Sequence, residues 1–553
     1  MDSVLAVSAK TGAGAQSQYA RAGRIISAQG WLETSGKLRL RAETGVLTTM
    51  NSRIGWLRSD AGILVLLALV SVTVHTATNG QYGFHRDELQ TLDDARHMDW
   101  GFVVYPPITP LIGRLELALF GTSLVGFRFF AAGAVSAAMV LAGLIAKELG
   151  GGRQAQVLAA TATCVAPVAL AQGAVFQYVS FDYLWGVLTT YFLVRLSKSG
   201  DARWWLAIGS ALGLGMETRY TAGFLTLGIV GGVLLTDARK YLLTKWLWMG
   251  VGISLLLFCP NVVWQARHHF ISLDFLKHLH ERDVRQGRSS GFLLGQILLC
   301  VNLVTVPLTF LGLRFLLARE EGRRYRQIGW TVVVTFLLFW IARARFYYTA
   351  PIYPVVLAAG SVTFGNWMNR AKTRTARFVN GLQWTAIALN GALVAVFVMP
   401  IAPFGGKAWR VTSKLHDQFR EQIGWTELTE NVARIYNSLP REERAHTGIL
   451  AGNYGEGGAL NLYGPALGLP HAMAGTNSFW YRGYDPREPR TVILVGFDLD
   501  EAQEKFASCS VAAKNTNRLG VENEESKYHP DILLCRGLKE SWPQFWARFR
   551  RYG

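Results

Sequence analysis

Apolar runs of roughly 20 residues recur between positions 61 and 400, and short polar segments separate them. A helix of about 20 apolar residues crosses the hydrocarbon core of a bilayer, which is about 30 Å thick. The pattern therefore predicts a polytopic α-helical membrane protein with about eleven spans, at residues 61–79, 127–146, 155–173, 182–197, 204–216, 220–236, 246–265, 291–313, 328–342, 346–364 and 382–400. An amphipathic segment over 109–120 is expected at the membrane interface rather than across it.

The pattern changes on either side of this region. Residues 1–58 are polar and basic, and they predict a cytoplasmic extension in which Met50 is a candidate for the true start. Residues 59–400 form the predicted transmembrane domain. From 401 onward, a helical pattern over 405–445 is followed by three short apolar runs, which predict strands. These runs are 447–451, 491–496 and 531–535. We therefore expect a soluble α/β domain over 401–553.

Composition and charge narrow the class of protein. Half of the 553 residues are hydrophobic and 17% are charged, which excludes a disordered chain. The net charge of +18 is compatible with nucleic-acid binding or with a membrane protein whose cytoplasmic loops are basic. The arginines and lysines gather in the short loops between apolar runs, as the positive-inside rule describes. This distribution argues against nucleic acid and places the longer loops, 80–126 and 266–290, and the tail outside.

Five cysteines are too few for a disulfide scaffold. Cys164, Cys259 and Cys300 lie within predicted spans and are expected to pack there. Cys509 and Cys535 form the one pair on the outer side. They are expected to form a disulfide in an oxidising compartment, and two buried free thiols remain the alternative.

The sequence after the first span, Phe84-His85-Arg86-Asp87-Glu88-Leu89, holds adjacent carboxylates at the membrane surface. Such groups are costly to desolvate and need hydrogen-bonding or cationic neighbours. One of them can accept a proton from a hydroxyl while the other orients it or pairs with a cation. A solvated loop whose acids have no chemical role explains the same spacing.

Three further places hold polar residues that are candidates for catalysis or binding, and a purely structural role is the alternative for each. Asp182 begins the fourth span among aromatic residues, either as a shielded acid or as a helix N-cap. Arg343 and Arg345 precede Tyr347 and Tyr348. An arginine there can bind a phosphate bidentately or extend to the interface beside an aromatic belt. The histidine-rich loop around His268 lacks compact metal-ligand spacing, which favours an ordinary polar, basic loop over a metal site.

Together these segments resemble a known family. They include FHRDELQTLDDARHMDWGFVVYPPITPLIGRLELALFG, FDYLW, WQARHHF, RFYYTAPIYPVVLAAG and NYGEGGALNLYGPALGLP. From about residue 53 to the C-terminus, the chain resembles the GT-C superfamily of glycosyltransferases. Within it, the chain is most similar to family 39, which includes protein O-mannosyltransferases and relatives of the lipid A aminoarabinose transferase. The Asp-Glu pair after the first span is the specific part of this resemblance.

The resemblance implies an inverting glycosyltransferase that uses a polyprenyl-phosphate-linked sugar. The acceptor is a lipid A, a glycan, another lipid or a protein. The reaction would occur on the outer face of the bacterial inner membrane, with the C-terminal domain in the periplasm. Asp87 matches the catalytic base, Glu88 completes its motif, and Asp182 matches a second acid of the same cavity. Arg345, with Arg343, is expected near the lipid phosphate. His85, Tyr105, His268, Tyr347 and Tyr348 are expected to line the cavity.

One departure concerns a metal ion. His268 matches a metal-binding histidine of the aminoarabinose transferase, but that enzyme's second ligand is a glutamate. At the comparable place this chain reads Val104-Tyr105-Pro106-Pro107. We therefore expect that no cofactor is required and that His268 is a polar site residue, with a divalent ion as the disfavoured alternative. A secondary transporter and a non-enzymatic factor in envelope glycan assembly remain the other functional classes. No nucleotide-binding glycine motif occurs in the right context.

Overall fold

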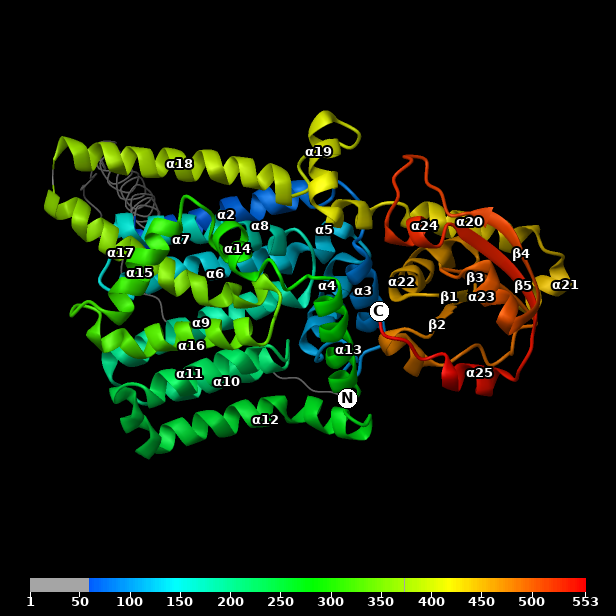
Figure 1. Ribbon diagram of the computed structural model, residues 1–553, viewed down its shortest axis with the longest axis horizontal. Coiled ribbons are helices and arrows are strands. Elements are labelled where there is room, and N and C mark those ends of the chain that lie inside the picture. The colour runs from blue at the N-terminus through cyan, green and yellow to red at the C-terminus, as the bar shows by residue number, and fades with distance from the viewer. Residues whose placement is uncertain (1–58, 372) are drawn as a thin grey trace, which may run out of the picture. The chain divides into compact units, whose positions relative to one another are not determined.

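The computed structural model describes residues 59–371 and 373–553, so the predicted extension 1–58 and the candidate start at Met50 lie outside the described residues. The described chain is mostly helical, with a small sheet near its C-terminal end (Figure 1). The α-helices up to position 398 are α2 (Asp60–Thr78), α3 (Arg86–Arg96), α4 (Ile108–Phe120), α5 (Leu124–Phe127), α6 (Phe129–Glu148), α7 (Arg153–Cys164), α8 (Pro167–Gly173), α9 (Tyr178–Ser199), α10 (Trp204–Met216), α11 (Ala222–Leu234), α12 (Lys245–Arg267), α13 (Ile271–Arg285), α14 (Phe292–Gly295), α15 (Val306–Leu317), α16 (Arg326–Ile341), α17 (Tyr353–Ala371) and α18 (Arg374–Val398).

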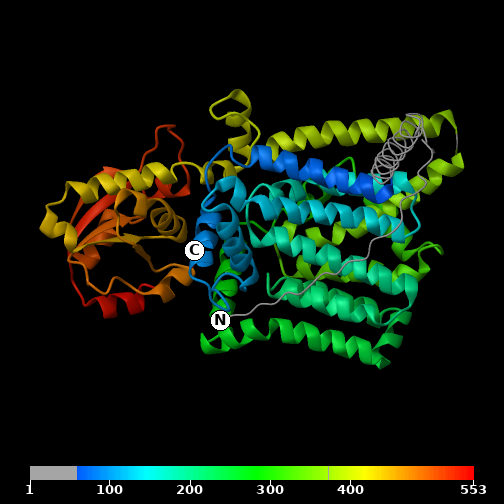
Figure 2. The same ribbon diagram turned by 180° about the vertical axis from the view of Figure 1, so that it is seen from behind.

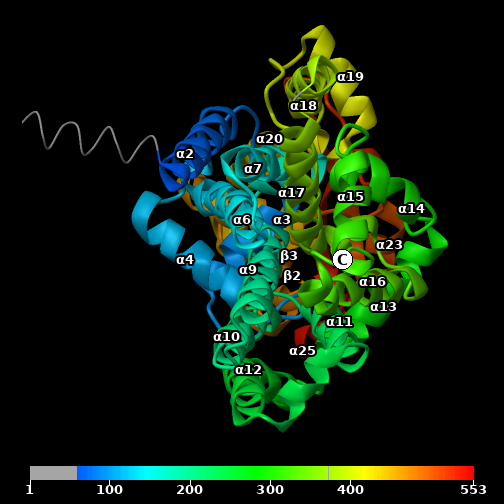
Figure 3. The same ribbon diagram turned by 90° about the vertical axis from the view of Figure 1, so that its left-hand side faces the viewer.

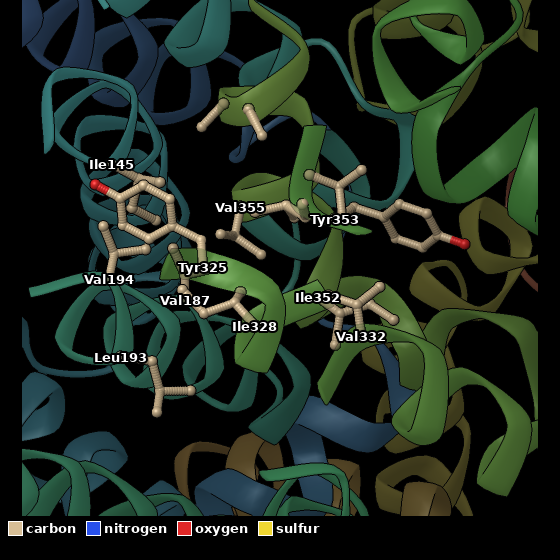
Figure 4. Close-up of a cluster of buried hydrophobic side chains, with 14 of the residues drawn as sticks. Ile145, Val187, Leu193, Val194, Tyr325, Ile328, Val332, Ile352, Tyr353 and Val355 are labelled. Atoms are coloured by element: carbon tan, nitrogen blue, oxygen red, sulfur yellow. The ribbon is translucent and has the colours of Figure 1, made fainter. Parts of the chain in front are cut away.

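The long helices pack side by side in a succession. Helices α6, α9, α10 and α12 contact one another in that order, and α2 and α17 pack against α6. Figure 3 shows this row from one end. The main apolar core lies between these helices, where Ile145, Val187 and Val194 meet Ile328, Val332 and Val355 from later helices (Figure 4). Burial of these aliphatic side chains holds the bundle together.

Four helical segments are long and apolar enough to cross a membrane: α2, Leu124–Glu148, α12 and α18. Three bent pairs raise the number to at most seven among the described residues. The predicted count of eleven spans is therefore not confirmed, although helices lie at each predicted position. Several of them, such as α10 with 13 residues, are shorter than the roughly 20 residues that a straight crossing needs.

The prediction of one continuous span over 291–313 is wrong, because the chain bends within this range. The chain forms Phe292–Val301, turns by 101°, and resumes as α15. Asn302 has a φ of 116°, which no helix accommodates, and a π-helical turn, η2 (Gln296–Val301), precedes it. Pro307 then stands in the first turn of α15, where its missing N–H costs nothing.

The C-terminal part is a mixed sheet with helices on both faces (Figures 1 and 2). Its strand order is β2-β1-β3-β5-β4, in which β1 pairs in parallel with β2 and β3, whereas β5 is antiparallel to β3 and β4. The strands are β1 (Thr447–Ala451), β2 (Ala472–Ala474), β3 (Thr491–Val495), β4 (Phe506–Lys514) and β5 (Asp531–Leu538). The helices are α19 (Lys407–Leu415), α20 (Trp425–Ser438), α21 (Arg441–Ala445), α22 (Tyr454–Tyr463), α23 (Leu499–Lys505), α24 (Glu524–Tyr528) and α25 (Trp542–Arg548).

Side chains alternate between the two faces of the sheet, as the strand period of two requires. Ile449 and Ile493 face α20 and α22, whereas Leu450 and Leu494 face α25. The three predicted strands are confirmed as β1, β3 and β5. The predicted disulfide is confirmed too, because Cys509 and Cys535 are bonded across β4 and β5, where they stand directly opposite each other.

The sheet domain packs directly on the first loop of the helical part. Helix α22 lies against α3, and Asp60–Gly553 form one compact unit. At the contact, a Cβ added to Gly458 of α22 would stand 2.7 Å from the backbone of Leu89 in α3. A glycine is thus required for the two helices to approach this closely.

Replacing Gly458 with alanine should separate α3 from α22. Overpacking of this kind typically costs about 1–3 kcal/mol, so we expect Gly458→Ala to lower the melting temperature of the purified full chain in detergent. Gly133→Ala in α6 is the matched control, since a Cβ there meets nothing within 4 Å and alanine favours the helix. Equal melting temperatures for Gly458→Ala and the wild type would contradict the close contact.

Candidate functional site

The motif after α2 forms the start of α3, and its local sequence explains why. His85 is the N-cap, and its Nδ1 accepts a hydrogen bond from the backbone N–H of Asp87 (3.1 Å). Glu88 completes the capping box, because its Oε2 accepts from the backbone N–H of His85 (2.7 Å). Asp87 therefore lies in the first turn of a helix, where the dipole stabilises a negative charge.

Glu88 and Arg128 form a buried ion pair, and both side chains are fully inaccessible to solvent. Arg128 donates from Nε to Oε1 (2.8 Å) and from Nη2 to Oε2 (2.6 Å). The backbone N–H of Phe176 donates a further bond to Oε1 (2.7 Å). Glu88 thus points away from solvent, so the adjacent carboxylates have different environments. Of the two adjacent acids, Glu88 is thus the one that pairs with a cation and positions α3, and it lies outside the cavity lining where a catalytic acid would stand.

The Asp87 carboxylate, in contrast, is 43% exposed and lines a cavity. Two donors hold it. Tyr454 at the start of α22 donates its hydroxyl hydrogen to Oδ1 (2.9 Å), and Gln177, just before α9, donates to Oδ2 (2.8 Å). Arg86 in turn donates from Nε to the Tyr454 oxygen (3.0 Å). Segments about 90 and 370 residues further along the chain therefore fix the orientation of one carboxylate.

The surroundings keep Asp87 ionised. Burial acts to raise the pKa of its carboxyl, but His85, Arg86 and the hydrogen bond from Tyr454 outweigh burial and hold the pKa below its ordinary value. Burial lowers the pKa of the His85 imidazole, and the neighbouring Asp87 and Glu88 carboxylates act in the opposite direction. Asp87 is consequently an exposed, oriented carboxylate that is ready to accept a proton or pair with a cation.

The cavity in front of Asp87 has a volume of about 630 Å³ and is lined by both parts of the chain. Of the predicted residues, His85, Asp87, Tyr105, Arg345 and Tyr347 line it. It also contains six basic side chains, namely Arg86, Arg282, Arg288, Arg345, Arg420 and Lys527. A space of this size takes a sugar with its linking phosphate.

Arg345 lies at the N-cap of η4 (Phe346–Ile352), in a bidentate pair with Asp283 of α13. Its Nε and Nη2 stand 2.6 and 2.7 Å from the two carboxylate oxygens, and Nη1 donates to the Tyr347 hydroxyl (3.2 Å). Arg288 approaches the same aspartate at 3.6 Å. Arg282, the residue before Asp283, also lines the cavity. Arg282, Arg288 and Arg345 together with Asp283 leave an excess of two positive charges on this wall of the cavity.

Arg343 is separate from this group. Its backbone adopts a φ of 48° and its side chain is exposed, outside the residues that line the cavity. The left-handed turn at Arg343 lets the chain leave α16 and enter η4. This turn orients Arg345 toward the cavity while Arg343 points elsewhere.

Asp182 is the second predicted residue that the structure keeps apart from Asp87. It borders a different, mostly apolar cavity of about 20 Å³, which is large enough for a water molecule but not for a sugar. Arg219 pairs with it at 3.4 Å, and the guanidinium also lies 4.0 Å from the ring centre of Tyr348 and 4.8 Å from that of Tyr178. This aromatic enclosure explains why Asp182 and Tyr348 lie behind the wall of the main cavity.

Tyr105 connects the cavity wall to the rest of α3. Its buried hydroxyl donates to Asp94 (2.7 Å), and Arg482 of the C-terminal part pairs with both Asp93 and Asp94. Asn477 adds a bond from Nδ2 to Gln90 (3.0 Å). The polar face of α3 is thus satisfied largely by the C-terminal part of the chain.

The residues around His268 do not fit a metal ion. The imidazole stacks on Trp264 at 3.9 Å, its Nδ1 lies 2.8 Å from the Trp264 carbonyl oxygen, and Tyr481 closes its other side. Among residues 59–371 and 373–553, no three His, Cys, Asp or Glu side chains come together as metal ligands would. His268 is also absent from the lining of the main cavity.

Four residues of this site were missed or left without a role in the sequence analysis: Arg128, Gln177, Asp283 and Tyr454. For Arg128 a signal existed, because a lone arginine at the start of an apolar span needs a buried partner. Asp283 lay in a loop taken as an ordinary basic segment. Gln177 and Tyr454 carry no charge, and only the fold brings them to Asp87.

The chain is similar to a known protein family and to solved structures. The model of the dolichyl-phosphate-mannose-protein mannosyltransferase family matches residues 104–264. The structure is similar to ArnT from Cupriavidus metallidurans bound to undecaprenyl phosphate, with a TM-score of 0.54 and 13% identity over 86% of this chain and 98% of that one. The apo form of that protein gives the same TM-score and identity, over 87% of this chain. No curated protein matches the sequence.

The GT-C resemblance is confirmed. At 13% identity the likeness establishes the fold alone, namely a helical part followed by a C-terminal domain. The apolar helices and the ArnT-like fold indicate a multi-pass membrane protein. The GT-C match also spans almost the whole ArnT chain, so the sheet domain is included in the shared architecture.

Glu88→Ala should act on stability. The variant leaves Arg128 charged and buried without its partner, which typically costs about 3–5 kcal/mol, so we expect a lower melting temperature in detergent and less folded protein. Glu443→Ala, which removes an acid from a half-exposed pair with Arg536, is the control and should change stability by about 1 kcal/mol or less. A Glu88→Ala protein as stable as the wild type would refute the positioning role.

Proposed function

We propose that this protein is an inverting glycosyltransferase that moves a sugar from a polyprenyl phosphate to an acceptor hydroxyl. The observation that carries the proposal is the single cavity in which an oriented carboxylate, Asp87, and an arginine-rich wall around Arg345 meet. The GT-C fold and the match to a dolichyl-phosphate-mannose family support a lipid-linked donor. The undecaprenyl phosphate bound by the similar ArnT supports a polyprenyl carrier.

In the proposed reaction, Asp87 accepts the proton of the acceptor hydroxyl. The acceptor oxygen then forms a bond to the anomeric carbon while the bond from that carbon to the phosphate oxygen breaks. The electron pair leaves with the polyprenyl phosphate, and attack from the face opposite the leaving group inverts the centre. General base catalysis of this kind contributes about 10²–10⁴-fold to a rate.

The leaving phosphate gains negative charge in this step, and the arginines supply its stabilisation. Arg345, Arg282 and Arg288 exceed the charge of Asp283 by two, which matches a phosphate monoester dianion. Asp283 and Tyr347 hold the Arg345 guanidinium in place before the reaction, and Arg288 pairs with the same aspartate; preorganised charge is worth several kcal/mol of barrier. We therefore keep the expectation that no metal cofactor is required.

The proposal places this cavity on the periplasmic face of a bacterial inner membrane. The disulfide between Cys509 and Cys535 favours an oxidising compartment for the C-terminal domain. Because Tyr454 of that domain contacts Asp87, the two must lie on the same side. The basic short loops at the other ends of the helices agree with a cytoplasmic location there.

Asp87→Asn should abolish transfer with the fold intact. Asparagine has the same shape, and its amide oxygen still accepts the hydrogen bond from Tyr454, but it does not accept a proton, so we expect turnover to fall at least about 100-fold. The measurement is release of undecaprenyl phosphate from a panel of undecaprenyl-phosphate-linked sugars by the purified full chain, with envelope extract as the source of acceptor.

Asp531→Asn is the control for this experiment, because Asp531 begins β5, pairs with Lys514 of β4 and is not among the residues that line the cavity. It should release undecaprenyl phosphate at the wild-type rate. Full activity of Asp87→Asn would remove the proposed base. Absence of release by the wild type with every sugar would refute the donor class.

Tyr454→Phe should raise the pKa of Asp87. A hydrogen bond to a charged group is worth about 1.5–3 kcal/mol, which corresponds to roughly one to two pKa units. The base acts only when ionised, so activity is lost as the pH falls through its pKa. Loss of the Tyr454 donor should therefore move the acidic limb of the pH–rate profile upward by about one unit, together with a lower kcat.

Tyr463→Phe in the same helix controls for loss of a tyrosine hydroxyl in α22, because Tyr463 does not line the cavity. We expect its pH–rate profile to coincide with that of the wild type. If Tyr454→Phe loses activity without any shift of the acidic limb, Tyr454 serves the packing of the domain and not the base.

A further inference from the structure

A further cavity lies at the other end of the helical part, between α15 and α17. The two helices cross in direct backbone contact, since a Cβ at Gly312 would stand 2.0 Å from the Val356 carbonyl oxygen and one at Gly360 would stand 1.9 Å from that of Leu308. Small residues allow such close approach between membrane helices. Beyond this crossing, toward the end of α17, a cavity of about 430 Å³ opens.

The wall of this cavity is apolar. Leu311 and Phe315 contribute from α15, and Phe364 and Trp367 from α17. Trp367 is 45% exposed, at the final turns of its helix. Exposed tryptophan at a helix end is typical of the zone where lipid headgroups meet hydrocarbon, so the cavity presents a surface suited to acyl chains.

The rim is strongly basic. Arg314, Arg319 and Arg370 line the cavity together with one acid, Glu321. Glu321 pairs with Arg319 at 3.3 Å, and both side chains are largely exposed, so this pair is weak. Three arginines and one glutamate leave two positive charges at the edge of an apolar pocket. A ligand that fits both features carries an anionic group attached to hydrocarbon.

The cavity lies at the opposite end of α17 from the proposed reaction site. Helix α17 has 19 residues and, at 1.5 Å per residue, measures about 28 Å. It begins next to η4, which follows Arg345 of the Asp87 cavity, and ends just beyond Arg370. Its length is close to the thickness of the hydrocarbon core, so we assign the arginine-rimmed cavity to the opposite membrane interface.

We propose that this cavity binds an anionic phospholipid of that leaflet. The phosphate sits between Arg314 and Arg370, and the acyl chains lie along Leu311, Phe364 and Trp367. Basic pockets between membrane helices bind anionic headgroups in this manner. The bound lipid would bridge α15 and α17 beyond their crossing, so it would stabilise the same helix that positions η4. The inference is independent of the proposed reaction.

The test uses the purified full chain in a detergent that removes native lipid. We expect added phosphatidylglycerol to raise the melting temperature, and phosphatidylethanolamine and inorganic phosphate to leave it unchanged. Arg314→Gln/Arg370→Gln should bind phosphatidylglycerol about tenfold or more weakly, because each basic residue adds to the attraction of an anionic lipid. Native mass spectrometry of the retained lipid provides a second readout that does not depend on unfolding.

Arg374→Gln/Arg377→Gln is the matched control, with the same loss of charge at the same end of the bundle but at exposed positions of α18, outside the cavity lining. It should keep the wild-type affinity. Arg314→Lys/Arg370→Lys retains the charge and serves if the glutamine variant fails to fold; it should keep most of the binding. Equal stabilisation by both phospholipids, or phosphatidylglycerol binding unaffected by Arg314→Gln/Arg370→Gln, would overturn the proposal, as would an equal effect of phosphate alone.

Discussion

The buried pair between Glu88 and Arg128 is the interaction on which the rest of this site depends. Arg128 also donates to the backbone carbonyls of Asn79 (2.7 Å) and Gly83 (2.9 Å) and to the Gln422 side chain (3.2 Å). One guanidinium therefore connects the end of α2, the start of α3, the start of α6 and the entry to the C-terminal part. A fully buried pair is tolerated only when its hydrogen-bonding groups are satisfied, and these partners satisfy them. The orientation of α3, and so of Asp87, follows from this pair.

Much of the fold could be predicted, because its signals are local. Continuous apolar runs marked the helices and the central strands β1 and β3, which are buried along their whole length. Strand β4 was missed because it lies at the sheet edge and most of its residues, such as Ser508 and Ser510, are exposed. The break at Asn302 was missed because an apolar run shows composition but not direction. A single asparagine within it gave no sign of a 101° turn.

In the candidate site, too, residues with a local signal could be predicted from the sequence, and residues placed by packing could not. Charged residues in unusual places, Asp87 and Arg345, were found from the sequence because charge near a membrane needs a reason. The different environments of Asp87 and Glu88 could not be predicted, since adjacent residues in a helix point about 100° apart and only the packing decides which one faces the cavity. The assignments of Asp182 and His268 to the same cavity were family inferences. Neither residue lines that cavity. Asp182 pairs with Arg219, which aromatic side chains enclose, and His268 stacks on Trp264.

The C-terminal domain contributes side chains both to the cavity and to the packing of α3. It supplies the Tyr454 hydroxyl to Asp87 and the arginine that pairs with Asp93 and Asp94, and its Gly458 lets α22 contact α3. Without these partners, Asp93 and Asp94 of α3 would keep only weaker neighbours among the described residues, such as His97 beside Asp93 and Tyr105 beside Asp94. Packing the acidic helix α3 on apolar helices alone would bury charged groups without partners, which is energetically costly. Helix α3 would therefore not remain folded there. The domain and the loop helix therefore form one structural element, and the geometry of the base is a property of both.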